Sequence, residues 1–104
     1  MSKTTVVHVR HSPFDIYIGR GGTYRLSTGW TLMEASDWGN PYRITKTRTR
    51  ESVIRMYEDW LLRTPELLAR LPELRGKRLG CFCAPQPCHG DVLARMADSL
   101  PELA

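Results

Sequence analysis

Apolar and polar residues alternate along the first part of the chain, and this alternation predicts strands. Residues 4–10 and 14–20 are short and rich in β-branched or aromatic residues, so we expect one strand in each. Residues 23–30 fit either a further strand or a mobile loop. Residues 36–41 predict a tight turn, because glycine supplies unusual backbone angles and the residue before a proline disfavours a helix.

After Thr49 the apolar residues recur at the spacing of a helix instead. One stripe is formed by Val53, Ile54, Tyr57, Trp60 and Leu61. A second helix is predicted to begin at Thr64 and Pro65, with Thr64 as its N-cap. Residues 78–83 predict a buried strand, and residues 88–99 predict a last helix with an apolar inner face.

This order of elements is typical of a small α/β fold, in which helical segments cross over between parallel strands. We therefore expect residues 1–104 to form a single α/β domain. Its sheet should have roughly three to five strands, at least partly parallel, packed by about three helices. A chain of 104 residues leaves no room for a second independent core.

Composition adds a modest positive charge. Lys and Arg number 15 against 11 Asp and Glu, and 12 of the cations are arginines, which suit forked contacts with phosphate or carboxylate. The net charge of +4 is too small for strong non-specific DNA binding. No apolar run approaches the ~20 residues of a membrane helix, and the N-terminal residues lead into a strand, so we expect a cytoplasmic protein without a membrane partner.

The cysteines lie close together in the sequence, at Cys81, Cys83 and Cys88. An odd number without a signal peptide favours free thiols in a reducing compartment. Cys81 and Cys83 should share one face of a strand, with Cys83 nearer the strand's carboxyl end. We interpret Cys81 as a small buried apolar residue.

Candidate chemistry centres on the predicted start of the last helix, where Cys88 and His89 are followed by Gly90 and Asp91. Unpaired amides at a helix N-terminus lower the pKa of a thiol and attract anions, so the pKa of Cys88 is expected to fall below its free value. We take Cys88, His89 and Asp91 as candidate catalytic residues. Asp91 fits equally well a purely structural role at the positive end of the helix.

The same segment admits a metal-binding interpretation. Zinc is held by about four Cys or His ligands, and Cys81, Cys83, Cys88 and His89 would supply four. A spacing of one residue between the first two departs from the usual two to four. A zinc cofactor therefore remains an alternative, and no other cofactor is indicated.

Three separated motifs carry a resemblance to a known family. They are Ile18-Gly19-Arg20, Trp38-Gly39-Asn40-Pro41-Tyr42, and the run from Leu79 to Leu93 that contains the cysteines. The chain resembles domain of unknown function 4326, a family of small proteins in bacteria and their phages, over roughly residues 5–97. Phe82 and Tyr42 stand where the family often has Trp and Phe. The family name states no function, so the resemblance implies a bacterial or phage-encoded protein and locates a site without naming a reaction.

Further candidate ligand-binding residues follow from these motifs. Gly19 and Arg20 could bring backbone amides and a guanidinium to a phosphate, although a glycine hairpin with an exposed arginine explains them equally well. Trp38 and Asn40 could hold a flat ring by stacking and hydrogen bonding, or Trp38 could be a core residue. The remaining candidates are Cys83 and Gly90 near the predicted helix terminus, and Arg10 near the carboxyl end of the first predicted strand, which could meet the end of the strand that carries Cys83. A basic stretch with Arg43, Lys46, Arg48 and Arg50 flanks the Trp38 turn.

We hold three functional hypotheses. The first is an enzyme or ligand-binding protein for a nucleotide, nucleoside or modified base, with chemistry at a glycosidic bond as the first reaction to test. It lacks the carboxylate pair usual for that chemistry, and it requires one pocket that joins Arg10, Arg20, Trp38, Asn40, Cys88 and His89. The second is a non-enzymatic module that binds nucleic acid or a host protein. The third is a structural zinc module. The sequence does not address the oligomeric state.

Overall fold

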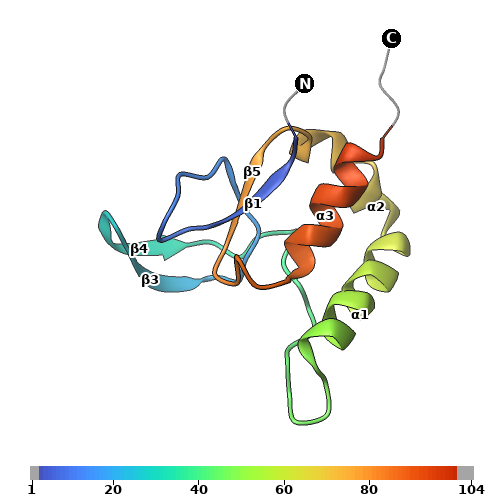
Figure 1. Cartoon of the computed structure of the whole chain (residues 1–104), viewed down its shortest axis with the longest axis horizontal. Coiled ribbons are helices and arrows are strands. Elements are labelled where there is room, and N and C mark those ends of the chain that lie inside the picture. The colour runs from blue at the N-terminus through green and yellow to red at the C-terminus, as the bar shows by residue number, and fades with distance from the viewer. Residues whose placement is uncertain (1–2, 101–104) are drawn as a thin grey trace.

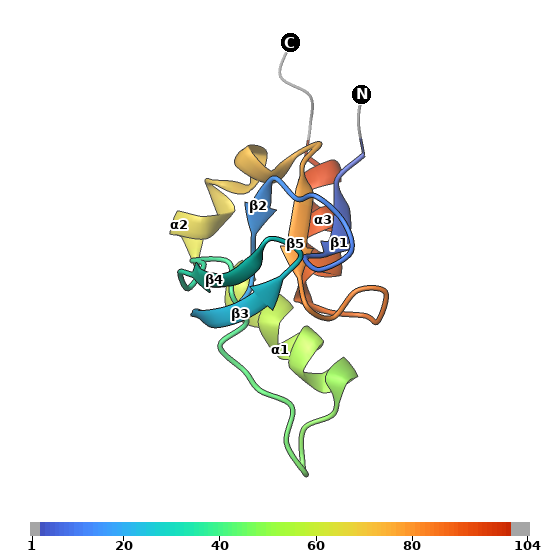
Figure 2. The ribbon, with the colours of Figure 1, turned by 90° about the vertical axis from the view of Figure 1, so that its left-hand side faces the viewer.

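A parallel sheet of three strands in the order β1-β5-β2 lies at the centre of the computed structural model, which describes residues 3–100. Strand β5 (Arg78–Cys81) pairs with β1 (Thr5–His8) on one side and with β2 (Ile16–Tyr17) on the other. The three carboxyl ends therefore meet at one edge of the sheet (Figure 2).

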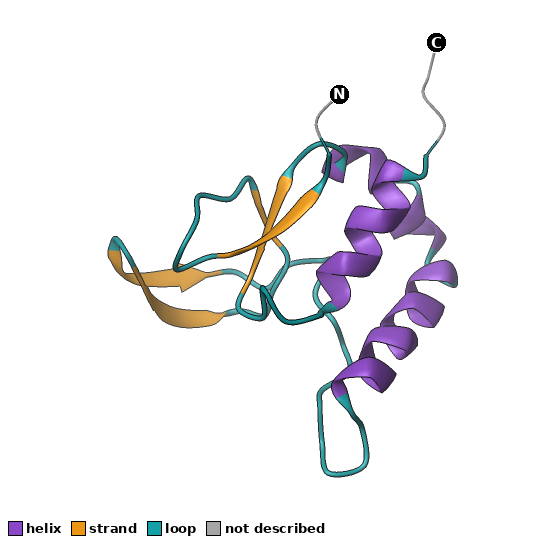
Figure 3. Cartoon of the chain, in the orientation of Figure 1, coloured by secondary structure: helices purple, strands orange, loops and turns teal. Residues whose placement is uncertain are grey.

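The helices gather on one side of this sheet (Figures 1 and 3). They are α1 (Arg50–Leu62), α2 (Pro65–Leu68), the 3-10 helix η1 (Leu71–Leu74) and α3 (His89–Asp98). Helix α3 contacts β1, β5, α1 and η1. The core between the layers is filled by side chains without exposed surface, among them Tyr57, Leu61, Leu74, Leu79 and Leu93. Burying these large side chains is the main stabilising contribution expected for so small a sheet.

An antiparallel hairpin projects from the other side of the sheet (Figure 1). It consists of β3 (Gly22–Leu26) and β4 (Gly29–Met33), joined by a tight turn in which Gly29 has a positive φ of 108°. The sequence is compatible with either a strand or a loop over residues 23–30, and in the structure this segment belongs to the two strands of the hairpin. Trp30 and Leu32 of β4 are both strongly exposed.

The fold class expected from the sequence is confirmed: a small α/β fold with three parallel and two antiparallel strands and three α-helices within residues 3–100. The predicted strand over residues 78–83 ends earlier, at Cys81, because Cys83 turns the chain by accepting a hydrogen bond from the Gln86 amide at 2.8 Å. Cys83 thus lies in the loop before α3 and not on the strand face.

The ends of two helices differ in how they are capped. Thr49 caps α1, since its hydroxyl accepts a hydrogen bond from the Ser52 amide at 3.1 Å. Thr64 is the N-cap residue of α2, as predicted, but its side chain makes no cap hydrogen bond and instead donates to the carbonyl of Trp60 at 2.7 Å. No helix within residues 3–100 combines the length and the apolar character that crossing a membrane requires.

Candidate functional site

A cleft of about 490 Å³ opens at the carboxyl ends of β2 and β5. Parallel sheets commonly bind ligands at this edge, where loops lead into helix N-termini. The cleft lies between the start of the β3–β4 hairpin, the segment before α1, and the loop that joins β5 to α3. It therefore brings together segments that are far apart in the sequence.

Three arginines line the cleft, and no Asp or Glu within residues 3–100 does so. Arg20 is anchored, since its Nη2 donates to the carbonyls of Asn40 at 3.0 Å and Tyr42 at 3.1 Å. Arg50 is also held, by a hydrogen bond from Nη1 to the Pro87 carbonyl at 3.1 Å. Arg43 is exposed and makes no hydrogen bond or ion pair with another residue of the described chain. The cleft thus carries an uncompensated positive charge with one guanidinium fully available to a ligand.

Aromatic rings form much of the cleft wall, contributed by Tyr17, Tyr24, Tyr42 and Phe82. The rings of Tyr24 and Phe82 pack with their centroids 4.5 Å apart. The hydroxyl of Tyr17 donates to the Arg20 carbonyl at 2.6 Å, and burial raises the pKa of Tyr17, so it stays a neutral donor. This wall is apolar and lies beside the arginines.

Two of the three cysteine sulfurs are in contact at the cleft wall. The sulfur atoms of Cys81 and Cys88 are 3.6 Å apart and both residues are buried, with 2% and 4% of their surface exposed. Cys83 is half-buried. Hydrogen bonding from the Cys81 and Cys88 thiols, aided by the nearby Arg50 guanidinium, lowers the pKa of Cys83. All three residues line the cleft.

The lowered pKa expected for Cys88 is therefore assigned to the wrong thiol. Cys88 does cap α3, and its sulfur accepts a hydrogen bond from the Gly90 amide at 3.3 Å, which favours the thiolate. Its hydrogen bonds to Cys81 and Cys83, together with burial, outweigh that contact and raise its pKa. Contact with Cys83 likewise raises the pKa of Cys81. Because neighbouring thiolates repel one another, the negative charge settles on Cys83, the most exposed of the three.

The side chain of His89 points into the protein. Its Nε2 lies 2.8 Å from the carbonyl oxygen of Ile18, and its ring packs edge-on against Tyr57 at 4.9 Å. Because a carbonyl only accepts, Nε2 carries the hydrogen. Burial lowers the pKa of His89, so the ring is neutral and joins the start of α3 to the chain beyond β2.

Asp91 and Gly90 shape the helix start without lining the cleft. The carboxylate of Asp91 accepts a hydrogen bond from the Cys88 amide at 3.0 Å and completes a capping box. A side chain at Gly90 would place its Cβ 2.8 Å from Ile18 Cδ1 and 3.1 Å from Val6, so only glycine lets the helix approach the sheet this closely.

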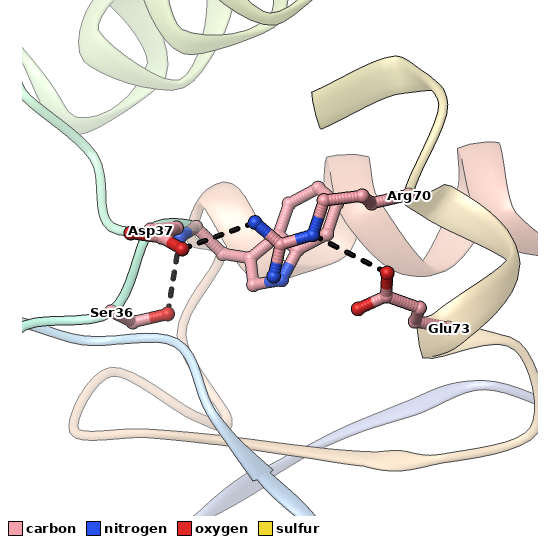
Figure 4. Close-up of polar contacts among 5 residues, drawn as sticks. Ser36, Asp37, Arg70 and Glu73 are labelled. Carbon is pink, nitrogen blue, oxygen red and sulfur yellow. Dashed lines mark hydrogen bonds and ion pairs between the residues drawn. The ribbon is translucent and has the colours of Figure 1, made fainter. Parts of the chain in front are cut away.

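The structure places the indole of Trp38 in the core. Only 3% of Trp38 is exposed, and the Arg70 guanidinium lies over its ring at 5.5 Å. Figure 4 shows how Arg70 is fixed there by ion pairs with Asp37 at 3.0 Å and Glu73 at 3.3 Å. The expected stacking platform for a ligand is therefore corrected to a packing role.

Asn40 lines the cleft, but its amide is occupied by the protein. Its Nδ2 donates to the Val53 carbonyl at 3.2 Å, and its Oδ1 accepts from the Tyr42 amide at 2.9 Å. Arg10 lies outside the cleft: its Nε donates to the Arg25 carbonyl at 2.9 Å, and its guanidinium lies over the Phe82 ring at 5.2 Å. Asn40 therefore holds the backbone of the cleft wall, and Arg10 packs on Phe82, a residue of that wall.

The structure thus brings some of the predicted site residues together and not others. The cleft is lined by Gly19, Arg20, Asn40, Cys83, Cys88 and His89. The residues outside it are Arg10, Trp38, Gly90 and Asp91. Sequence reasoning missed the aromatic wall, because Tyr17, Tyr24 and Phe82 read as ordinary strand residues. Their alternation with polar residues in strand segments gave no sign of which face would meet a ligand.

The four candidate zinc ligands do not converge as a set. Within residues 3–100, no group of three or more His, Cys, Asp or Glu is arranged to hold a metal ion. The imidazole of His89 is committed through Nε2 to the Ile18 carbonyl, which removes that nitrogen from the thiols.

Fold and site together define a small α/β protein with a basic, thiol-containing cleft at the carboxyl ends of its parallel strands. The chain belongs to the family described as Domain of unknown function (DUF4326), whose model matches residues 2–99. The resemblance seen in the sequence motifs is thereby confirmed.

Two viral proteins are similar to this chain over most of its length. An uncharacterized 12.4 kDa protein from the nrdA-td intergenic region of Enterobacteria phage T4 is 35% identical, covering 91% of this chain and 78% of the phage protein. The uncharacterized protein R718 of Acanthamoeba polyphaga mimivirus is 32% identical, covering 79% of this chain and 65% of the viral protein. No solved structure matches the chain.

Proposed function

We propose that the protein binds an anionic small molecule with a flat ring, of the nucleotide class, in the cleft at the carboxyl ends of β2 and β5. The observation that carries this proposal is the joint lining of the cleft by three arginines and four aromatic rings, without a carboxylate among the described residues. A volume of about 490 Å³ lies in the range typical of small-molecule sites.

The arginines support binding of the anionic end of the ligand. Arg43 has its whole guanidinium free for a forked contact with a phosphate, whereas Arg20 and Arg50 each spend part of theirs on backbone carbonyls. Because no acidic side chain among residues 3–100 lines the cleft, all three guanidiniums raise the local concentration of anions.

The aromatic wall supports binding of the flat ring. The packed pair of Tyr24 and Phe82 offers a rigid apolar surface, and Tyr42 lies next to Arg43 in the opposite segment. Stacking between a base and an aromatic ring is tolerant of sequence and worth about 1–3 kcal/mol per base. These side chains take the role that the sequence suggested for Trp38.

The proposed function is binding of the ligand, without cleavage of its glycosidic bond. Glycosidic-bond chemistry usually needs carboxylates, and Asp91, the one acidic candidate, is the capping residue of α3 and lies outside the cleft. The reactive groups that the cleft offers are its thiols.

Calorimetric titration of the reduced protein tests the proposal. We expect a nucleoside 5′-monophosphate to bind more tightly than either the nucleoside or inorganic phosphate alone. Arg43→Gln should weaken that binding about tenfold or more, because a charge-assisted contact is lost. Arg55→Gln, on the exposed face of α1 outside the cleft, is the matched control and should change little.

The proposal fails if the monophosphate does not bind, or if both arginine variants weaken binding equally. A second candidate, binding of single-stranded nucleic acid, is favoured by the exposed Lys46 and Arg48, which follow Arg43 out of the cleft. An oligonucleotide that binds far more tightly than its monomer, with a steep salt dependence, would establish that alternative.

A further inference from the structure

We propose that the three cysteines form a peroxide-reactive site, in which Cys83 is the attacking thiol and Cys88 resolves it to an intramolecular disulfide. This inference goes beyond ligand binding and does not depend on it. The substrate class is a small hydroperoxide, with hydrogen peroxide as the simplest member.

Exposure decides which sulfur an oxidant meets first. Cys81 and Cys88 are almost completely buried, whereas Cys83 is half-buried in the loop that leads from β5 to α3 (Figure 1). A small molecule that enters the cleft therefore reaches Cys83 before the other two thiols. Reactive cysteines in proteins are characteristically accessible in this way.

The surroundings of Cys83 also favour its thiolate, which is the reactive form of a thiol. Two buried thiols and the Arg50 guanidinium stabilise the anion, so its pKa lies below the ordinary value. Arg50 is fixed in place by its hydrogen bond to the Pro87 carbonyl at 3.1 Å. A positive charge near the reacting sulfur also stabilises the hydroxide that leaves when a peroxide bond breaks.

In the first step the Cys83 thiolate attacks one oxygen of the hydroperoxide. A sulfur–oxygen bond forms, the oxygen–oxygen bond breaks, and hydroxide or alkoxide leaves, so that Cys83 becomes a sulfenic acid. In the second step the sulfur of Cys88 attacks the sulfur of Cys83 and displaces hydroxide, which takes up the proton of the Cys88 thiol as water. With hydrogen peroxide, two thiols are oxidised by two electrons to one disulfide, and the peroxide is reduced to two molecules of water.

Cys88 is suited to the second step by its place in the fold. Once Cys83 is a neutral sulfenic acid, its negative charge no longer opposes ionisation of Cys88. The Gly90 amide, 3.3 Å from the Cys88 sulfur, and the N-terminal end of α3 then favour a Cys88 thiolate. Cys81 ends β5 and is not itself the capping residue of α3.

The test follows the intact mass and the thiol count of the reduced protein during treatment with hydrogen peroxide. We expect the wild type to lose about 2 Da and to keep one thiol open to alkylation after unfolding. Peptide mapping should join Cys83 to Cys88. Cys88→Ser should instead accumulate a sulfenic acid on Cys83 that dimedone traps.

Cys83→Ser is the decisive variant, because it keeps the sulfurs of Cys81 and Cys88 in contact at 3.6 Å. We expect its rate of reaction with peroxide to be at least about tenfold lower than that of the wild type, because no accessible thiolate remains. Cys81→Ser is the matched control and should still form the disulfide. Circular dichroism of each variant checks that it is folded.

Three results would overturn the proposal: oxidation of Cys83→Ser at the wild-type rate, a wild-type disulfide between Cys81 and Cys88, or one tightly bound zinc ion per chain that protects the thiols. Nucleotide titration is performed on the reduced protein. Failure of the thiol chemistry therefore leaves the proposed binding function intact, and the reverse also holds.

Discussion

The carboxylate of Asp15 ties the chain before β2 to the first residue of β5. It accepts hydrogen bonds from the Arg78 amide at 2.7 Å and from the Arg78 guanidinium at 3.2 and 3.0 Å. The return bond, from the Asp15 amide to the Arg78 carbonyl, is 2.8 Å long. These contacts set the position of β2, whose carboxyl end forms one side of the cleft.

The Asp15 contact predicts a defined pH dependence of stability. Hydrogen bonds from Arg78 lower the pKa of Asp15 from 3.8 to about 2 in the folded protein. The contribution of this carboxylate to stability is therefore fully present above pH 3.8 and is lost as the pH falls toward 2. Asp15→Asn should be less stable than the wild type at neutral pH, and the difference should shrink across that interval.

Urea unfolding at a series of pH values measures this effect. Asp59→Asn, on the exposed surface of α1, serves as the control and should track the wild type throughout. A destabilisation by Asp15→Asn that is the same at pH 2 and pH 7 would contradict the role given to the Arg78 contact.

For single residues, the sequence predicts the position of candidate groups better than their role in the fold. The sequence predicts a site in the run from Cys81 to His89, and the structure puts the three thiols of this run in one cleft. Which thiol carries the charge depended on the turn after Cys81 and on the Arg50 side chain, which come from different parts of the fold. Trp38 was ambiguous in sequence because the same indole suits a core and a binding surface.

The side chain of Thr49 fixes the start of α1, whereas the side chain of Thr64 does not fix the start of α2. Only the Thr49 hydroxyl accepts a hydrogen bond from an amide of the helix that follows it. The Thr64 hydroxyl contacts the preceding helix instead. The two threonines therefore form a matched pair for measuring what a cap contributes.

We expect Thr49→Ala to lower the free energy of unfolding by about 1 kcal/mol, the usual cost of losing a capping side chain. Thr64→Ala should cost less, because it leaves every amide of α2 with its present partners. Chemical denaturation of both variants measures the two losses in the free energy of unfolding. Equal losses, or a larger loss for Thr64→Ala, would contradict the assignment of the caps.

The helices and strands themselves were largely predictable. The apolar stripe of α1 and the apolar inner face of α3 follow from local spacing, and both elements are present. The strands were predicted too long, because the pairing partner sets where a strand ends and the sequence does not name the partner. The hairpin β3–β4 was left open for the same reason.

The α/β class follows from the order of the predicted elements, but the strand order β1-β5-β2 does not. That order places the carboxyl end of β2 beside that of β5 and so creates the cleft. The segment before α1, with Tyr42, Arg43 and Ile44, forms another wall of the cleft. Composition alone could indicate an affinity for anions, but only this arrangement concentrates three arginines around one aromatic wall.

The most direct test of the nucleotide-binding cleft is a titration of the reduced, isotopically labelled protein with a nucleoside 5′-monophosphate, followed by amide chemical shifts. The account predicts saturable shifts confined to the cleft segments, around Gly19 to Tyr24, Asn40 to Arg50 and Phe82 to His89. Arg43→Gln should require a much higher ligand concentration for the same shifts. Shifts centred on the exposed Trp30 and Leu32 of the hairpin, or no saturable shifts in the cleft, would contradict it.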